Sequence, residues 1–245
     1  MAIPRLYCPI QLKHRAQATL PDAAAHHAAR VLRLKRGDEV RLFNGEGGEF
    51  EASIHLTAKD AVIVDIGRHH DVERESPLKV CLAQAVTTGE KMDYTLQKAV
   101  ELGVARIQPL QTQRSVVRLD QERADKRRRH WHNVVIAACE QCGRNTVPDV
   151  AAIISLEEWV ATTKSEEMRL MLSPFAEKNL CEFSAPVGEI SLLAGPEGGF
   201  SNEEIEFALA KGFQSARLGP RVLRTETAPL AALAAMQMLW GDFVA

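Results

Sequence analysis

Two segments rich in glycine and proline carry the residue types best suited to hold a small ligand. In 191–200, an apolar run breaks at Gly195 and Pro196, and a second such turn occupies 218–229. Each turn precedes a predicted helix start, so exposed backbone amides should lie beside a strand end. Glycine lets a backbone approach a ligand closely, and proline fixes φ. We therefore expect two preshaped binding loops.

Charged and hydroxyl side chains gather in the second loop, in the Arg-Thr-Glu-Thr run at 224–227. The following Pro229 suits the first turn of a helix. After the first loop, Ser201 and Glu204 form a capping box, which accounts for both residues structurally. The capping box leaves the preceding glycines unexplained, so we favour a ligand role for both loops over simple tight turns.

Other common site chemistries lack their motifs. The loop 195–199 has no Gly-Lys-Ser/Thr for a phosphate-binding loop, the spaced glycines of a dinucleotide site are absent, and no nucleophile elbow is present. Cys139 and Cys142 would share a helix face, but a zinc site needs four ligands and no second cysteine pair exists. We expect neither nucleotide hydrolysis nor a bound metal.

The elements that must position these loops alternate between strand and helix from Val80 onward, which predicts an α/β domain with a largely parallel sheet. The expected strands are 80–86, 105–110, 168–172, 189–194 and 214–218. The expected helices are 92–102, 120–142, 202–211 and 229–240. The basic run 123–129 is more often a solvated helix face than an RNA contact.

Before this region, alternating residues and glycine turns predict short strands at 39–43, 48–56 and 60–66, typical of a small antiparallel barrel or sandwich. One helix is expected over 22–34, with Ala28, Val31 and Leu32 on one side.

The same helix would carry His26, His27, Arg30 and Arg33 on another part of its surface. A phosphate-facing patch and a solvated face explain these four residues equally well. Further on, the polar segment 69–77 ends in proline and marks a boundary. We expect one domain over 1–70 and a second over 76–245.

Composition is that of a folded globular protein: 245 residues, 46% hydrophobic, with a net charge of −2. Residues 76–150 carry 12 basic and 8 acidic side chains, whereas residues 151–245 carry 7 and 13. A nucleic acid could therefore bind a local patch, but the overall charge does not favour tight nonspecific binding. Without a secretory signal or a membrane-spanning apolar run, we expect a cytoplasmic protein that contacts no membrane.

The two loops resemble the cofactor-site motifs of the SPOUT methyltransferases, and more narrowly of the 16S ribosomal RNA (uracil-N3)-methyltransferases. The resemblance rests on Gly195-Pro-Glu-Gly-Gly-Phe-Ser201 and Leu218-Gly-Pro-Arg-Val-Leu-Arg-Thr-Glu-Thr-Ala228. Further matches are Lys91-Met-Asp93, Gln97-Lys-Ala-Val-Glu-Leu-Gly103, Glu140-Gln-Cys-Gly-Arg144, His26-His-Ala-Ala-Arg-Val-Leu-Arg33 and Gly37-Asp38. It spans nearly the whole chain, although Cys142 replaces a serine common in the family.

The resemblance implies an α/β protein with an N-terminal PUA-like small β-barrel that binds RNA, followed by a SPOUT methyltransferase domain with a trefoil knot. It also implies a homodimer whose partner is 16S ribosomal RNA of the small ribosomal subunit. S-adenosylmethionine would bind in the knot, mainly through backbone groups. The implied cofactor-binding residues are Leu172, Gly195, Glu197, Gly199, Leu218, Gly219, Val222, Leu223, Thr225, Thr227 and Ala228.

For methyl transfer to uracil N3, the N3 proton must leave; a nearby carboxylate could act as the base, and a cation could stabilise the charge that spreads onto the uracil oxygens. We expect Glu197 or Glu226 in the first role and Arg224 in the second, although helix dipoles alone could explain both acids. The expected RNA-binding residues are Arg5, Arg30, Arg33, Lys91, Arg114 and Arg144. Two alternatives stay open: a related methyltransferase with another RNA target, and a ribosome-assembly or RNA-binding factor with incidental catalysis.

Overall fold

The computed structural model describes residues 3–58, 61–115, 120–162 and 168–244. The chain forms two compact units. Unit 1 comprises Met1–Glu75 together with Cys139–Val147, and unit 2 comprises Ser76–Ala138 and Pro148–Ala245. The segment Cys139–Val147 thus groups with unit 1 although it lies within the second expected domain in sequence.

Unit 1 contains, in its described residues, a five-stranded sheet in the order β1-β3-β4-β5-β2. Its strands are β1 (Arg5–Tyr7), β2 (Gln17–Thr19), β3 (Glu39–Phe43), β4 (Glu49–Thr57) and β5 (Val62–His70). β1 pairs with β3 in parallel and the other neighbours are antiparallel. Alternate residues of β5, Val62, Val64 and Ile66, are buried, as expected for a sheet with one face on a core.

The expected helix over 22–34 was wrong in its second half. The α-helix α1 covers only Asp22–His26, and a π-helical turn, η1, follows at His27–Val31. The N–H of Leu32 bonds the carbonyl of His27 at 2.9 Å, five residues back. This wider turn shifts the helical register. Ala28 is buried as expected, but Val31 is 62% exposed and Leu32 is 37% exposed, so neither residue joins Ala28 in the core.

The segment Cys139–Val147 is tied to β1 by hydrogen bonds within unit 1. The backbone N–H of Tyr7 donates to Glu140 Oε1 at 3.0 Å, and Arg5 Nη2 donates to Asn145 Oδ1 at 2.8 Å. Asn145 is fully buried and donates in turn to the carbonyl of Val72. Buried polar groups must be paired, so these bonds give the Glu140–Asn145 run a structural role.

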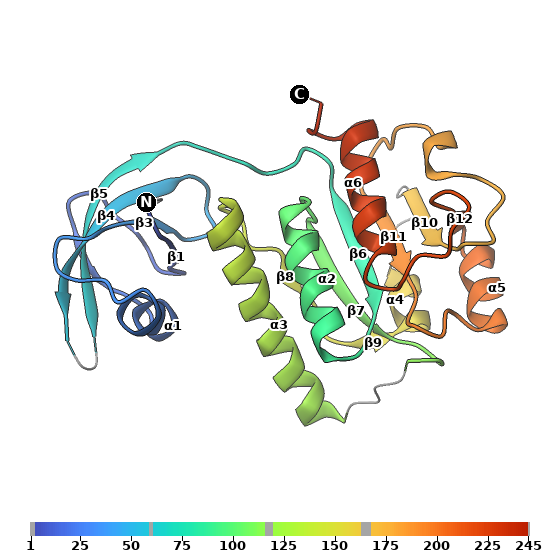
Figure 1. Cartoon of the computed structure of the whole chain (residues 1–245), viewed down its shortest axis with the longest axis horizontal. Coiled ribbons are helices and arrows are strands. Elements are labelled where there is room, and N and C mark those ends of the chain that lie inside the picture. Colours follow the sequence, from blue (N-terminus) through green and yellow to red (C-terminus); the bar gives the residue numbers. More distant parts are fainter. Residues whose placement is uncertain (1–2, 59–60, 116–119, 163–167, 245) are drawn as a thin grey trace. The chain divides into compact units, whose positions relative to one another are not determined.

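Unit 2 is built, in its described residues, around a seven-stranded parallel sheet in the order β12-β10-β11-β6-β7-β8, with β9 also paired to β7 (Figure 1). The strands are β6 (Val80–Ala85), β7 (Arg106–Gln111), β8 (Asp149–Val150), β9 (Ile154–Ser155), β10 (Met168–Leu172), β11 (Ile190–Ala194) and β12 (Gln214–Ala216). The prediction of a largely parallel sheet is confirmed.

Helices connect these strands and cover the sheet. They are α2 (Gly89–Glu101), α3 (Gln121–Cys142), α4 (Leu156–Thr162), the short 3-10 helix η2 (Leu180–Glu182), α5 (Asn202–Ala210) and α6 (Ala228–Trp240). α6 packs against α2 and β11, and α4 packs against α5 and β7. Every residue of β6 and β11 is buried, which is typical of strands covered on both faces.

The core beneath α4 and α5 contains Cys81, Leu110, Trp159, Leu193 and Phe213. On α2, the expected stripe of Met92, Leu96, Ala99 and Val100 is buried, and Gly103 ends the helix with a φ of +81°. Across the described ranges, no helix combines the length and apolar character that a membrane span requires.

Candidate functional site

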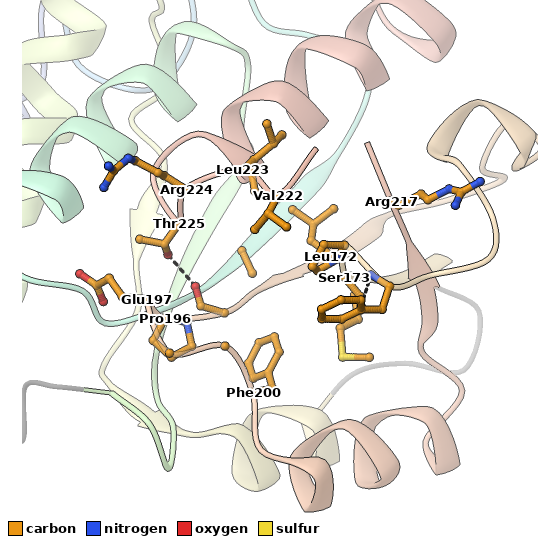
Figure 2. A pocket seen from close by; sticks show the side chains of 18 of the residues that line it. Leu172, Ser173, Pro196, Glu197, Phe200, Arg217, Val222, Leu223, Arg224 and Thr225 are labelled. Carbon is orange, nitrogen blue, oxygen red and sulfur yellow. Dashed lines mark hydrogen bonds between the residues drawn. The ribbon is translucent and has the colours of Figure 1, made fainter. Parts of the chain in front are cut away.

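A cavity of about 660 Å³ opens in unit 2 where β10, β11 and β12 end (Figure 2). Because these strands are parallel, their carboxyl ends meet at one edge of the sheet, where ligands of α/β proteins commonly bind. Three segments form its walls: 171–175 after β10, 194–200 after β11, and 216–228 between β12 and α6. Both loops singled out by their glycines and prolines therefore face one cavity.

Most residues expected to bind the cofactor line this cavity. Those that do are Leu172, Gly195, Glu197, Gly199, Leu218, Val222, Leu223, Thr225 and Ala228. Gly219 and Thr227 are not among the lining residues, so their direct contact role is not supported. Gly219 instead permits a turn, with a φ of +74°, and Thr227 precedes α6 as its N-terminal cap residue.

Backbone conformation explains the glycines of the first loop. Gly199 has a φ of +68°, a region that residues with a Cβ rarely adopt, and apart from its chain neighbours no atom of the described residues lies within 4 Å of where its Cβ would be. A Cβ on Gly195 would lie 3.1 Å from the Phe200 ring. Glycine therefore keeps this wall of the cavity free of side chains.

A side-chain hydrogen bond joins the two loops. Thr225 Oγ1 donates to the carbonyl oxygen of Gly195 at 2.6 Å, as the dashed line in Figure 2 marks. The residues are thirty apart in sequence, and the bond crosses from the turn before α6 to the end of β11. It fixes the separation of the two walls.

A third segment anchors the first loop from outside. Glu204 is 2% exposed; its Oε2 accepts from Ser201 N–H, completing the capping box, and its Oε1 accepts from Gln113 N–H at 2.8 Å. The neighbouring Arg114 donates from Nη1 to the carbonyls of Gly198 and Phe200, at 3.2 and 3.1 Å. The segment after β7 thus holds the glycine loop against the start of α5.

The acid Glu197 is already engaged. Its Oε1 accepts from Thr88 Oγ1 and from Lys91 Nζ, both at 3.2 Å, and from Thr88 N–H at 3.5 Å. Thr88 precedes α2, and its own side chain makes no capping bond. Partial burial raises the pKa of Glu197, but backbone hydrogen bonds and Lys91 outweigh it, so its pKa lies below the usual value. Glu197 is therefore held as a carboxylate by Thr88, the residue before α2, and by Lys91, and it is a weak base.

The second acid, Glu226, has a different environment. Its Oε2 is buried and accepts no hydrogen bond from the described residues. Arg224 lines the same cavity and lies on the same side as Glu197 in Figure 2, opposite Leu172 and Ser173. One turn, 224–226, therefore supplies both an acid and a cation to the lining of the cavity.

Two residues expected to bind RNA serve the packing of unit 1. Arg144 has a side chain only 6% exposed and donates from Nε and Nη2 to Glu75 Oε2, at 2.9 and 2.6 Å. Arg5 is 11% exposed and forms an ion pair with Glu49. A buried cation requires its partner, so these ion pairs give both arginines a structural role, and their contact with phosphates stays a prediction.

The other four expected RNA-binding residues divide into two pairs. Arg30 and Arg33 lie on the surface of unit 1 and form no ion pair with any described residue. Lys91 and Arg114 line the cavity, where they contact Glu197 and the glycine loop. Of these four residues, Lys91 and Arg114 are the two that line the cavity.

Sequence reasoning missed several lining residues, among them Ser173, Pro174, Phe175, Ile205 and Arg221. Phe175 is 89% exposed and Val222 75% exposed, which is unusual for large apolar side chains. The Ser-Pro pair directly after the strand 168–172 was an available signal, because it is a turn at the carboxyl end of a parallel strand.

In the part of the chain that the structure describes, no group of three or more His, Cys, Asp or Glu side chains is arranged to hold a metal. Burial raises the pKa of Cys139 to about 12, so it remains a thiol.

Comparison with known proteins agrees with the fold. A family model described as RNA methyltransferase domain matches residues 74–237, and one described as RNA methyltransferase PUA domain matches residues 20–67. The fold and site therefore define an RNA methyltransferase with an N-terminal PUA domain. The expected α/β fold class, with a PUA domain before a methyltransferase domain built on a parallel sheet, is confirmed.

Full-length relatives narrow the class. Ribosomal RNA small subunit methyltransferase E of Buchnera aphidicola subsp. Schizaphis graminum is 35% identical over 240 residues, covering 98% of each chain. The Bacillus subtilis protein of that name is 32% identical, covering 95% of each. A crystal structure of the Neisseria gonorrhoeae enzyme, bound to S-adenosylmethionine, superposes with a TM-score of 0.96 at 44% identity, covering 99% of this chain and 100% of that chain. The chain belongs to the ribosomal RNA small subunit methyltransferase E family.

Replacing Thr225 with valine should destabilise unit 2 by about 1 kcal/mol, because the carbonyl of Gly195 loses its donor while side-chain size is kept. Urea unfolding followed by tryptophan fluorescence measures the change. Thr227→Val is the matched control, since Thr227 makes no capping bond and does not line the cavity. Equal stability of the two variants would show that the bond between the loops contributes nothing.

Proposed function

We propose that this protein transfers a methyl group from S-adenosylmethionine to the N3 atom of one uridine in small-subunit ribosomal RNA. The observation that carries the proposal is the cavity at the carboxyl ends of β10, β11 and β12, in a chain whose fold matches that of a relative solved with S-adenosylmethionine. The names of the relatives supply the RNA class, small-subunit ribosomal RNA.

The residues of the cavity fit S-adenosylmethionine. Its volume of about 660 Å³ lies within the range of sites for drug-sized ligands. Leu172, Ile205 and Leu223 offer apolar surface for an adenine ring, and the glycine loop 195–199 offers backbone amides and carbonyls. When bound, S-adenosylmethionine supplies a methyl group on a positively charged sulfur, which a nucleophile displaces in line.

The side chains left for chemistry are those of the turn 224–226. Uracil N3 becomes a nucleophile only when its proton leaves, and the electron pair of the N–H bond then stays on N3. We assign the proton to Glu226 Oε2, the buried oxygen without a partner among the described residues. The guanidinium of Arg224 balances the negative charge that spreads onto the uracil oxygens. Glu197, occupied at α2, is not the proton acceptor.

Uracil N3 is hidden in a base pair, so the target uridine must be unpaired or extruded before it enters the cavity. In this proposal, residues 1–70 form the RNA-binding domain and residues 76–245 the methyltransferase domain. The surface residues Arg30 and Arg33 hold phosphates, and the shape of the RNA selects the site.

The proposal includes a homodimer, a trefoil knot around the cofactor, and a cytoplasmic location where small-subunit RNA is made. Apolar side chains exposed on unit 2 support the homodimer: Tyr94 on α2, Met238 and Leu239 on α6, and Phe243 and Val244 beyond it. Such a surface is typical of a subunit contact. Sedimentation analysis checks it, and a monomer at micromolar concentration would contradict the homodimer.

Substituting Gly199 with valine should weaken binding of S-adenosylmethionine by about tenfold or more, because a β-branched residue is strained at a φ of +68° and adds a side chain to the cavity wall. Calorimetric titration measures the affinity. Gly212→Val is the matched control, since Gly212 has a φ of +87° but lies outside the cavity. Equal affinities in both variants would remove the loop from the cofactor site.

Primer extension through small-subunit RNA tests the reaction itself. A methyl group on N3 blocks base pairing, so reverse transcription should stop at one uridine in the parent strain and read through in a deletion strain. The wild-type gene should restore the stop. Glu226→Gln should slow methylation about 10²- to 10⁴-fold, with unchanged cofactor affinity. Glu206→Gln, an acid on α5 outside the cavity, is the control. An unaltered modification map in the deletion strain refutes the proposal.

The double substitution Arg30→Ala and Arg33→Ala should weaken RNA binding and leave cofactor binding intact. Each lost phosphate contact should also lower the dependence of log K on log salt by about 0.7–0.9. Filter binding at several salt concentrations measures both effects. Arg68→Ala is the control, because Arg68 is an exposed arginine of unit 1 paired with Glu51. RNA affinity equal to that of the control would dismiss the assignment.

A further inference from the structure

The charged side of the cavity holds a second cation that the proposed chemistry has not used. Lys91, on the first turn of α2, lines the cavity together with Arg224 and Glu226. The sequence motifs led us to expect that Lys91 binds RNA phosphates. In the structure its ammonium lies 3.2 Å from Oε1 of Glu197, and Glu197 also lines the cavity. The side chain is 35% exposed, so it is neither a free surface cation nor a buried structural one.

Glu197 holds Lys91 in one place. The same carboxylate oxygen accepts the hydroxyl and the backbone N–H of Thr88, which precedes the first turn of α2. Three donors on one oxygen fix the carboxylate, and the carboxylate fixes the ammonium. Burial raises the pKa of Glu197, but backbone hydrogen bonds and Lys91 outweigh it and lower the pKa, so Glu197 is held as a carboxylate.

An ammonium group has three donor hydrogens and no acceptor. One hydrogen is directed to Glu197, which leaves two for a ligand in the cavity. Arg224 on the same cavity is also a donor only, and Glu226 Oε2 is an acceptor without a partner among the described residues. The cavity therefore offers two cationic donors and one acceptor.

This set matches one edge of uracil. Around N3, uracil presents an acceptor, a donor and an acceptor: O4, N3–H and O2. Cytosine carries an amino group, which is a donor, in place of O4, and its N3 is an acceptor. A cation placed to donate to O4 of uracil would therefore meet another donor in cytosine. Loss of the N3 proton spreads negative charge onto O2 and O4, which two cations stabilise better than one.

Building on the proposed function, we propose that Lys91 contacts the O4 atom of the target base, selects uracil over cytosine, and stabilises the N3 anion, with Glu197 as its positioning residue. Arg224 then faces O2 and Glu226 faces N3. Lys91 contributes at the base and does not bind phosphate.

The test uses the full-length protein and two transcripts of small-subunit RNA that differ only at the methylated position, uridine or cytidine. Competition binding gives the preference for uridine, and methylation of the uridine transcript is followed against pH. Lys91→Met should lower the uridine preference about tenfold. It should also move the alkaline rise of the pH–rate profile upward by about one pH unit, since the N3 anion loses a stabilising charge. Lys91→Arg should restore both in part.

A matched control lies on the same helix. Lys98 is 34% exposed and pairs with Glu101 at 2.7 Å, but neither residue lines the cavity. Lys98→Met should therefore leave the preference and the pH profile unchanged. Glu197→Gln keeps an acceptor for Thr88 while removing the charge beside Lys91, so it should show a weaker form of the Lys91→Met effect.

Failure of this inference is distinguishable from failure of the proposed function. If the wild-type protein binds no S-adenosylmethionine or methylates no uridine, the proposed function fails. If the wild type is active and Lys91→Met weakens both transcripts equally with an unchanged pH profile, Lys91 is a phosphate contact and this inference alone is overturned. An unchanged preference and profile in Lys91→Met likewise overturns it.

Discussion

The parallel pairing of β10 with both β11 and β12 is the constraint on which the site depends. The registers Leu172 with Ala216 and Met171 with Leu193 bring the three strand ends to the same level. The chain must leave the sheet at that edge after each of these strands. The turns after β10, β11 and β12 therefore lie side by side, although they are far apart in sequence. Antiparallel pairing of any one strand would send its loop to the opposite edge and open the cavity.

The sheet determines where the cavity lies, and two hydrogen bonds then determine its shape. Thr225 bonds the carbonyl of Gly195 across the cavity, and Glu204 bonds Gln113 behind the glycine loop. Both ties end on backbone groups rather than on other side chains. Backbone groups are fixed by the strand or helix to which they belong, so the loops between them lose little further entropy when a ligand binds. The site is thus preorganised by the same strands that place it.

Much of this architecture could be predicted from the sequence. Buried parallel strands give continuous apolar runs, and helices with one buried and one exposed face give a helical period of apolar residues. The strand Met168–Leu172 has the bounds that its apolar run predicts, and both glycine loops line the cavity, as their composition indicated. The two-residue strands β8 and β9 and the seven-residue α4 escaped detection, because so few residues establish no period. The π turn at His27–Val31 was missed because it preserves helical composition while it changes the register.

Pairing of charges was the part that sequence could not supply. Arg5 meets Glu49 and Arg144 meets Glu75 across 44 and 69 positions, and Lys91 meets Glu197 across 106. Helical or strand periodicity reports only near neighbours, so each of these cations looked as free as Arg30 and Arg33. Long-range contacts also explain why the sequence did not indicate that Cys139–Val147 groups with unit 1, since this segment joins unit 1 through hydrogen bonds to β1.

The two acids of the site, Glu197 and Glu226, differ chemically because they differ in their hydrogen-bond partners. Glu197 accepts hydrogen bonds from Thr88, the residue before α2, and from the ammonium of Lys91. Backbone hydrogen bonds and Lys91 outweigh the effect of burial and lower its pKa, which removes it as a base. Glu226 precedes α6 but leaves Oε2 without a donor among the described residues. One sequence thus uses the same side chain to build a helix end in one loop and to keep an acceptor open in the next.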